Sequence, residues 1–252
     1  EYKLMGLAPY GDAIYTDKIY KLIDIKEDGS FRLDQSYFNY ATGLTMTNDK
    51  FDKLFGQKPR NTKLENLTQF HMNIAASIQK ITEEIIIKLA KSLKNEFGFE
   101  NLCLAGGVAL NCVANGKLLK EKIFKNIWVQ PAAGDAGGSL GAALALWHID
   151  QNNPRKLNIN DNMQGSYLGP EFSQKEIEEE LKKVGANFEI MKEDDLINKT
   201  AECISKGDAI GWFQGRMEFG PRALGGRSIL GDPRSSEMQK NLNLKVKYRE
   251  SF

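Results

Sequence analysis

The chain has 252 residues, a formal net charge of +1, 41% hydrophobic residues and three cysteines. This length can bury a core and hold one large domain or two modest ones. The balanced charge argues against nucleic acid or an acidic membrane as partner, and three scattered cysteines exclude a disulfide framework and a zinc ribbon. No apolar run is long enough to span a membrane and no signal peptide is visible, so we expect a cytoplasmic protein.

The first part of the chain predicts a small hairpin followed by a long helix. Residues 12–43 alternate apolar and polar positions around Asp28-Gly29, a dipeptide typical of tight turns. Residues 64–97 then place an apolar side chain at every third or fourth position. This spacing predicts an amphipathic helix, which Gly98 is expected to end.

Two stretches each combine a short strand, a glycine turn and a helix. Residues 102–115 read LCLAGGVALNCVAN, with Asn111 expected about one turn inside the helix. Residues 127–129 form the second strand, and a small-residue loop carrying Asp135 leads into a helix rich in glycine and alanine. The repeated layout predicts an α/β fold and is typical of nucleotide sites, where helix amino termini face phosphate. Glycine turns of this kind also occur for packing alone.

The cysteines and histidines in these stretches are expected to be structural. Cys103 and Cys112 lie in apolar segments, so we predict that they are small core residues. His71 and His148 have no second histidine nearby, so we expect packing or hydrogen bonding rather than ligand binding.

A polar, asparagine-rich stretch at residues 147–162 predicts a linker or domain boundary. Beyond it, Ser173 followed by Glu176 predicts a capping box at the start of a helix that ends near Val184, and its charges are expected to form a solvated face. The remaining predicted elements are a strand at 188–191, a helix at 194–206, a strand at 209–213 and a helix at 237–244.

The most informative stretch is residues 211–234, GWFQGRMEFGPRALGGRSILGDPR, in which arginines are spaced among glycines and prolines. Glycine allows a close backbone approach, and the guanidinium group offers a planar fork of donors that suits phosphate or carboxylate. The stretch therefore predicts a loop that binds a polyanionic substrate. The alternative is a glycine-rich surface loop with solvated arginines.

Five motifs together resemble the NodU and CmcH carbamoyltransferase family. They are KLMGLAPYG (3–11), LAGGVALN (104–111), QPAAGDAGGSLGAAL (130–144), GRMEFGPRALGGRSILGDPR (215–234) and LNLKVKYRESF (242–252). The resemblance runs over nearly the whole chain, and the long arginine-rich motif is specific. In that family sequence continues on both sides of these points, so we expect the chain to be an internal fragment.

The resemblance implies an α/β protein with two parts. Residues 1–150 would be the carboxy-terminal part of an actin- and sugar-kinase-like nucleotide-binding domain that transfers the carbamoyl group. Residues 151–165 would be a linker. Residues 166–252 would begin a second, truncated α/β domain, which is similar to the YrdC-like proteins that form carbamoyl adenylates.

The resemblance also implies roles for individual residues. The catalytic residues would be Arg222, Arg227 and Lys245; the substrate-binding residues would be Lys247, Arg249, Arg216 and Lys3, with Arg234 a weaker choice; and the nucleotide-binding residues would be Gly106, Gly107, Asn111, Gly134 and Gly137.

Asp135 would be a ligand of a divalent metal, iron or magnesium. The family's other ligands are two histidines one helical turn apart, and this sequence has no such pair, so they would precede residue 1. The alternative for Asp135 is capping of the helix that follows it.

The implied activity is O-carbamoyl transfer. Carbamoyl phosphate and ATP would give carbamoyl adenylate and pyrophosphate, and the carbamoyl group would pass to a hydroxyl of a small acceptor such as a sugar, a nodulation factor or an antibiotic-like metabolite. Positively charged side chains would screen the repulsion between the two anionic substrates. No Ser-His-Asp or Cys-His set is evident, so no acyl-enzyme is expected. The expected partners are these small molecules, with neither nucleic acid nor membrane, and a homodimer is compatible with the sequence.

Three alternatives stay open. The same scaffold supports tRNA threonylcarbamoyl transfer and hydrogenase-maturation carbamoyl transfer. The balanced charge argues against the first, and the lack of CxxC motifs argues against the second. A non-catalytic nucleotide-binding regulatory module is the third.

Overall fold

The computed structural model describes residues 2–62, 64–158 and 160–248, and the chain divides into two compact units, Glu1–Val129 and Gln130–Phe252. The division falls before the glycine- and alanine-rich helix, whereas the family resemblance predicts that this helix belongs to the first domain. A division by compactness does not test where the family domains begin and end, so the predicted domain boundaries stay a prediction. Small two-stranded sheets and helices make up both units, in agreement with the predicted α/β class.

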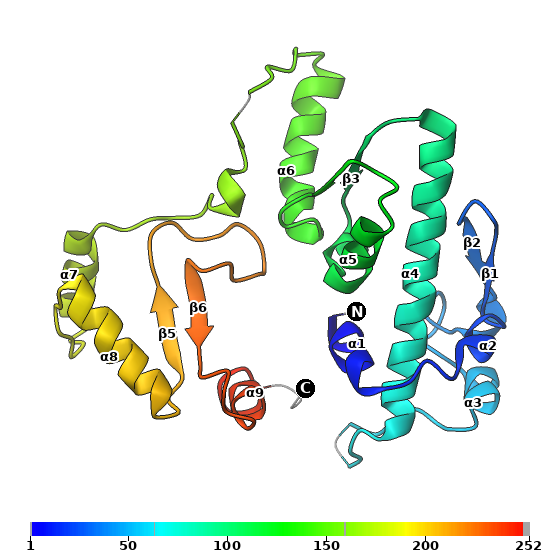
Figure 1. The fold of residues 1–252 in the computed structure, drawn as a ribbon, viewed down its shortest axis with the longest axis horizontal. Coiled ribbons are helices and arrows are strands. Elements are labelled where there is room, and N and C mark those ends of the chain that lie inside the picture. Colours follow the sequence, from blue (N-terminus) through cyan, green and yellow to red (C-terminus); the bar gives the residue numbers. More distant parts are fainter. Residues whose placement is uncertain (1, 63, 159, 249–252) are drawn as a thin grey trace. The chain divides into compact units, whose positions relative to one another are not determined.

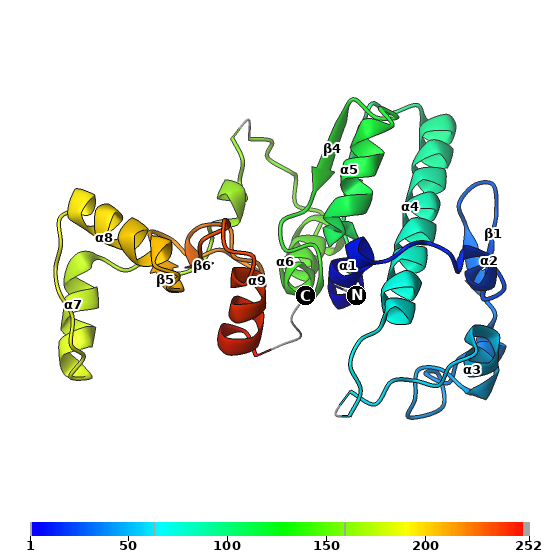
Figure 2. The same cartoon turned by 60° about the horizontal axis from the view of Figure 1, so that its bottom comes forward.

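The first unit contains one long helix with shorter elements along it (Figures 1 and 2). Strands β1 and β2 form an antiparallel hairpin, as predicted around Asp28-Gly29, and strands β3 and β4 pair in parallel. The elements are α1 (Tyr2–Leu7), α2 (Thr16–Ile19), β1 (Ile23–Ile25), β2 (Phe31–Leu33), α3 (Asp49–Phe55), α4 (Gln69–Phe97), β3 (Asn101–Leu104), α5 (Cys112–Lys120) and β4 (Asn126–Val129), with 3-10 turns at Ala8–Tyr10, Gln35–Tyr37 and Gly107–Leu110.

Helix α4 confirms the predicted amphipathic helix, except for its first turn. It begins after Thr68, whose backbone N–H donates to Nδ1 of His71 at 3.0 Å in a capping box. It ends at Gly98, which takes the left-handed conformation with φ 67°. Residues 64–67 were included in the prediction but precede the cap, because apolar spacing alone does not locate a helix start.

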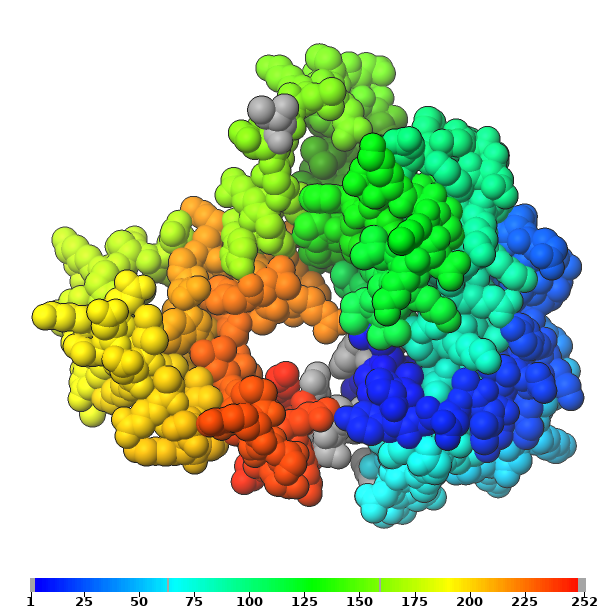
Figure 3. All heavy atoms as spheres, in the orientation of Figure 1, coloured from blue at the N-terminus to red at the C-terminus, as the bar shows by residue number. Residues whose placement is uncertain are grey.

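Apolar side chains on both sides of α4 form the core of the first unit. Ile19, Leu22, Phe55 and Ile81 are buried where α2 and α3 meet the helix. Ala90, Leu118 and Phe124 are buried where α5 and the β3–β4 pair meet it. On the face drawn in Figure 3, the blue amino-terminal segment and the green α5 region lie over the cyan helix.

Part of the buried stripe of α4 is polar, because it binds the backbone of the residues before α2. Oδ1 of Asn73 accepts the N–H of Asp12 at 2.9 Å, and the hydroxyl of Ser77 accepts the N–H of Tyr15 at 3.0 Å. The Ser77 hydroxyl also donates to the carbonyl of Asn73 at 2.6 Å. These bonds satisfy polar groups that burial would otherwise penalise, and they fix the segment against the helix.

The prediction that Cys103 and Cys112 are core residues is wrong, since both are exposed. Alternate residues of a strand face opposite sides. In β3, Leu102 and Leu104 pack against the core, so Cys103 faces away from it, opposite Trp128 of β4. Cys112 is the first residue of α5 and lies outside the helix face that carries buried Leu118.

The second unit contains helices and an antiparallel pair of strands (Figure 1). Within the described residues, no helix of the chain combines the length and the apolar character of a membrane span. The elements are α6 (Asp135–Ala145), α7 (Gln174–Lys183), α8 (Glu193–Ser205), β5 (Ile210–Phe213), β6 (Arg227–Leu230) and α9 (Met238–Asn241), with single turns of π-helix at Leu146–Asp150 and Leu242–Val246 and a 3-10 turn at Gln164–Ser166.

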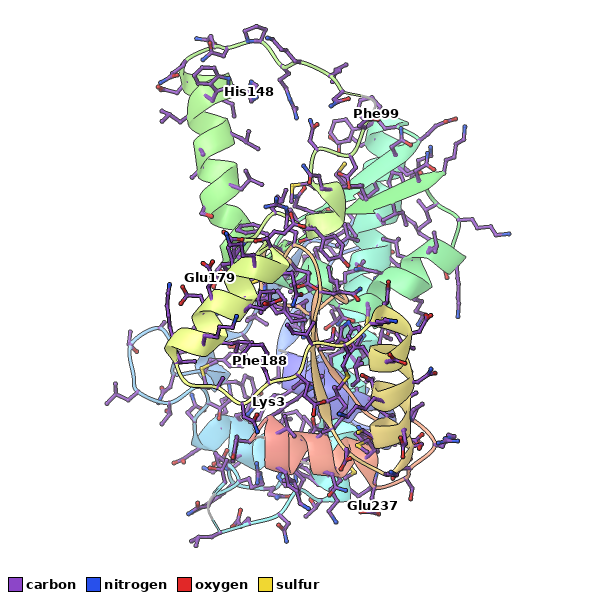
Figure 4. All side chains as sticks on the ribbon, turned by 90° about the vertical axis from the view of Figure 1, so that its left-hand side faces the viewer. Lys3, Phe99, His148, Glu179, Phe188 and Glu237 are labelled. Atoms are coloured by element: carbon purple, nitrogen blue, oxygen red, sulfur yellow. The ribbon has the colours of Figure 1, made fainter. Side chains whose placement is uncertain are left out.

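The local predictions for this unit are mostly confirmed. The capping box of α7 is present, with the Ser173 N–H donating to Oε2 of Glu176 at 2.7 Å, and α7 carries its charges on an exposed face where Figure 4 labels Glu179. The strand predicted at 188–191 is wrong: Figure 4 labels Phe188 on the extended connection between α7 and α8, which has no strand in the described structure. An extended segment becomes a strand only where another strand is available to pair with it.

Candidate functional site

The arginine-rich stretch forms the connection between β5 and β6. Phe213 and Arg227 face each other as the last pair of the antiparallel ladder, and the N–H of Gln214 donates to the carbonyl of Gly226 at 2.9 Å. Residues 215–225 therefore form a long loop with a hydrogen-bonded neck. The strands fix both ends of this loop, so its shape depends on what fills its interior.

The side chain of Glu218 fills the interior of this loop. Its carboxylate has no exposed surface, and Oε1 accepts the backbone N–H groups of Leu224 at 2.6 Å and Gly226 at 2.8 Å. Oε2 lies 3.4 Å from Nε of Arg227. Burial alone would raise the pKa of Glu218, but the backbone N–H groups of Leu224, Gly226 and Arg227 lower the pKa below its usual value. The carboxylate is therefore held in its charged form.

A segment distant in sequence supports the outside of the loop. The N–H of Phe219 donates to the carbonyl of Ser166 at 2.7 Å, and the buried Ser166 hydroxyl donates to the carbonyl of Phe219 at 2.8 Å. The hydroxyl of Tyr167 donates to the carbonyl of Leu224 at 2.7 Å. Ser166 has a φ of 80°, which is rare for a residue with a side chain. Its backbone conformation is therefore imposed by these contacts.

A pocket of about 360 Å³ opens beside this loop. Its lining combines a phenol, an amide, a guanidinium group and bare backbone: Tyr167, Gln214, Gly215, Arg216 and Gly226. The indole N–H of Trp212 donates to Oε1 of Gln214 at 2.9 Å, which orients that amide. A small ligand with anionic and hydrogen-bonding groups fits this chemistry.

Arg216, Arg227 and Arg234 have acidic partners. Arg216 donates to the carbonyl of Gly169 at 2.8 Å and pairs with Glu171 at 3.1 Å, and Arg227 pairs with Glu218. Arg234 makes a bidentate pair with Asp232, whose pKa is lowered to about 2 by side-chain hydrogen bonds from that guanidinium. These pairs hold the guanidinium groups in fixed positions but cancel much of their charge. Exposed Arg222 lies near the tip of the loop.

The loop that carries Asp135 reaches the arginine-rich loop. A Cβ placed on Gly220 would lie 2.6 Å from Cβ of Ala132, so the two turns are in direct contact within the second unit. Ala132 itself has a φ of 54°, and a Cβ on Gly137 would lie 2.3 Å from its carbonyl oxygen. Packing thus accounts for glycine at 137. The structure brings the Asp135 loop and the loop of Arg222 together, although they are far apart in sequence.

Asp135 is exposed at the first position of α6, and Gly134 occupies the cap position without a side-chain cap bond. The alternative in which Asp135 caps the helix is therefore not what the structure contains. Among the residues that the structure describes, no three His, Cys, Asp or Glu side chains gather as a metal site would require. Asp135 alone supplies one carboxylate, so the described residues do not form a metal site by themselves.

The glycine turn of the first unit lies between β3 and α5. Gly106 needs glycine for its φ of 98°, but Gly107 has an ordinary φ, and a Cβ there would meet nothing within 4 Å. Packing among the described residues therefore does not require glycine at 107. The nucleotide-binding role of the turn stays a prediction.

Asn111 is the N-cap of α5, and not a residue one turn inside the helix as predicted. Its Oδ1 accepts the N–H of Ala114 at 3.1 Å, and its amide exchanges hydrogen bonds with that of Gln79 at 2.9 and 3.2 Å. Gln79 was not found by sequence reasoning. A signal was present, since a glutamine on the apolar stripe of a helix needs a buried partner. The amide of Asn111 is therefore engaged in holding the glycine turn to α4.

The remaining predicted residues lie elsewhere. Lys3 is exposed on α1, and Lys245 and Lys247 are exposed near the end of the described chain, while Arg249 lies outside the described residues. Both histidines make structural hydrogen bonds, as expected: His71 to Thr68, and His148 through Nδ1 to the carbonyl of Asn153 at 3.0 Å. No observation tests the individual roles assigned to the site residues, which stay predictions.

The sequence matches the family model described as carbamoyltransferase N-terminus over residues 1–144 and the model described as carbamoyltransferase C-terminus over residues 201–252. The chain therefore belongs to the carbamoyltransferase family. The second match contains the loop organised by Glu218, and the first contains both glycine turns. The family resemblance inferred from the motifs is thus confirmed.

Three relatives match this chain over its whole length. An uncharacterized protein of Synechocystis is 60% identical over 100% of this chain, nodulation protein NolNO of Sinorhizobium fredii is 41% identical over 100%, and nodulation protein NolO of Bradyrhizobium diazoefficiens is 38% identical over 100%. The matches cover 41%, 35% and 43% of those three proteins, so the chain spans about two fifths of their length.

Proposed function

We propose that this protein is an O-carbamoyltransferase that uses carbamoyl phosphate and ATP to carbamoylate a hydroxyl of a small acceptor. The observation that carries the proposal is the loop between β5 and β6. It belongs to the matched family region, presents Arg222 at an exposed position, and borders a pocket with polar lining. A rigid loop with guanidinium groups in fixed positions suits a phosphorylated substrate.

The proposed reaction has two steps. In the first, water cleaves carbamoyl phosphate to carbamate and inorganic phosphate, and a carbamate oxygen attacks the α-phosphorus of ATP, so that carbamoyl adenylate forms and pyrophosphate leaves. In the second, the acceptor hydroxyl attacks the carbamoyl carbon and AMP leaves. The acceptor class, a sugar or another hydroxylated metabolite, follows from the family and stays a proposal.

We assign the phosphate groups to the arginine-rich loop. Arg222 is the main candidate, because it is exposed near the tip of the loop within the matched family region. Arg216 lines the pocket and retains N–H groups that can orient an anion. Exposed Lys245 and Lys247 would add positive charge, and we propose the same supporting role for Lys3.

We assign ATP to the glycine turns. Gly106 and Gly107 leave space for a phosphate to approach the backbone, and Asn111 would act by holding that turn. The residues of the second turn are Gly134 and Gly137. We propose Asp135 as one ligand of a divalent metal, but the described residues do not complete such a site.

The test is carbamoyl-phosphate-dependent pyrophosphate release by the full-length protein. Arg222→Ala should lower the rate on the order of a hundredfold, since one donor to a developing charge contributes about 3 kcal/mol. Arg155→Ala is the matched control: Arg155 is an exposed arginine in the polar stretch between α6 and α7, and its loss should leave the rate unchanged. An unchanged rate in Arg222→Ala would refute the assignment of the loop.

The alternatives predict other outcomes of the same assay. ATP binding without pyrophosphate release would indicate a regulatory nucleotide-binding module. Transfer that requires tRNA, or a maturation protein as acceptor, would indicate one of the related enzymes on this scaffold.

A further inference from the structure

The carboxylate of Glu218 is enclosed by the loop that we assign to the phosphates. The whole residue is 3% exposed, and its two oxygens have different surroundings. Oε1 receives two backbone N–H groups, from Leu224 and Gly226. Oε2 is buried without a hydrogen bond from any described residue and faces the guanidinium of Arg227.

The backbone of the loop is shaped to close on this carboxylate. A Cβ on Gly226 would lie 3.2 Å from Oε2 and 2.8 Å from the carbonyl oxygen of Arg216, so only glycine allows this approach. Gly220 and Gly225 have φ values of 104° and 115°, which residues with side chains rarely adopt. Backbone N–H groups that converge on one point form an anion site. Here the protein's own carboxylate takes that place.

The enclosed carboxylate contacts one arginine of the loop, Arg227, and the backbone that follows another, Arg222. Glu218 pairs with Arg227 at one end, and its hydrogen bonds to Leu224 and Gly226 fix the backbone on the carboxyl side of Arg222. The carbonyl of Phe219, on the other side, is fixed by Ser166. The backbone of Arg222 is therefore held from both sides by buried groups, although its side chain is exposed.

We propose that Glu218 is a positioning residue for carbamoyl phosphate: its buried carboxylate sets the conformation of residues 219–226 and thereby the place at which Arg222 meets the substrate. This proposal rests on the proposed function. A merely stabilising residue would change how much of the protein is folded. A positioning residue changes the affinity of the folded protein for its substrate.

Two substitutions in the full-length protein separate these roles. Glu218→Gln keeps the shape but places an NH2 group or a neutral oxygen among donors, and Glu218→Asp keeps the charge but shortens the side chain. Glu179→Gln on the exposed face of α7 is the matched control, since it removes the same charge far from the loop in sequence.

The first measurement is hydrogen exchange followed by mass spectrometry, which needs no activity. We expect the amides of residues 219–226 to exchange at least tenfold faster in Glu218→Gln, with a smaller increase in Glu218→Asp and none in Glu179→Gln. Exchange in α8 should be unchanged, because the carboxylate of Glu218 contacts Leu224, Gly226 and Arg227 and not that helix. Unchanged exchange in residues 219–226 would overturn the proposal.

The second measurement is the apparent KM for carbamoyl phosphate in pyrophosphate release, together with its Kd by calorimetry. Both should rise at least tenfold in Glu218→Gln, with an intermediate rise in Glu218→Asp. A lower kcat with unchanged KM and Kd would mean only loss of folded protein and would overturn the positioning role. If the wild-type protein neither binds carbamoyl phosphate nor releases pyrophosphate, the proposed function fails and the positioning role fails with it, while the exchange result still decides whether Glu218 holds the loop.

Discussion

Leu118 offers a direct test of how the first unit holds its glycine turn. It lies on α5 and is 1% exposed, in the cluster with Ala90 and Phe124. The next residue, Leu119, is 60% exposed on the same helix. Leu118→Ala and Leu119→Ala therefore make the same chemical change in the same helix, and they differ only in burial.

The magnitude follows from burial and from the space that the truncation leaves. Replacing a buried leucine with alanine removes apolar contacts and creates a cavity, at a cost of about 2–5 kcal/mol. Because Leu118 is almost fully enclosed by α4, β3 and β4, we expect a value of about 3 kcal/mol. Leu119→Ala should cost less than about 0.5 kcal/mol, as is usual for surface positions.

Hydrogen exchange of β3, α5 and β4 measures this loss in the full-length protein without assuming that the whole chain unfolds in one step. A loss of about 3 kcal/mol corresponds to exchange on the order of a hundredfold faster. Equal effects of the two substitutions, or less than a fivefold increase in Leu118→Ala, would refute the assignment of Leu118 to the core.

Four further predictions concern glycines and titrating groups. Gly116→Ala should raise the local free energy of unfolding by about 0.5–1 kcal/mol, because Gly116 is inside α5 and a Cβ there meets nothing within 4 Å. Gly11→Ala should lower the free energy of unfolding by about 1–3 kcal/mol, since its Cβ would lie 2.1 Å from the carbonyl oxygen of Met72. Hydrogen exchange in α5 and in α4 measures the two changes. Burial and then the charge of Arg60 lower the pKa of His71, so the unfolded state binds a proton more readily and stability falls as the pH drops below about 6.5. The protection factors of amides in the first turn of α4, which correct for the slower intrinsic exchange at lower pH, should therefore fall in mild acid, and His71→Gln should remove this pH dependence. Hydrogen bonds from Arg234 lower the pKa of Asp232 to about 2. The charged carboxylate therefore contributes to the stability of the fold above pH 3.8, and this contribution is lost as the pH falls toward 2. Asp232→Asn should abolish this acid-sensitive part of the stability, as followed by the protection factors of the amides in β6.

Sequence determined the features that arise from neighbouring residues. The apolar spacing of α4, its glycine end, and the capping box of Ser173 and Glu176 are local, because one turn of helix contains all the interacting groups. The hairpin at Asp28-Gly29 is local for the same reason. The family motifs could also be recognised from the sequence, since each is a contiguous stretch of residues.

Only the tertiary structure decided which distant residues meet. The extended segment at 188–191 pairs with no strand among the described residues. Cys103 faces away from the core because of the side of β3 on which it lies. The ion pairs of the arginines include one local and one distant pair. Asp232 is two residues from Arg234, whereas Glu171 and Arg216 come together only when the chain folds. The contact between Ala132 and Gly220, and the bracing of Phe219 by Ser166, likewise join residues far apart in sequence. Such pairings depend on the path of the whole backbone, so the arginine-rich motif alone predicts an anion-binding loop but does not reveal the buried carboxylate of Glu218 inside it.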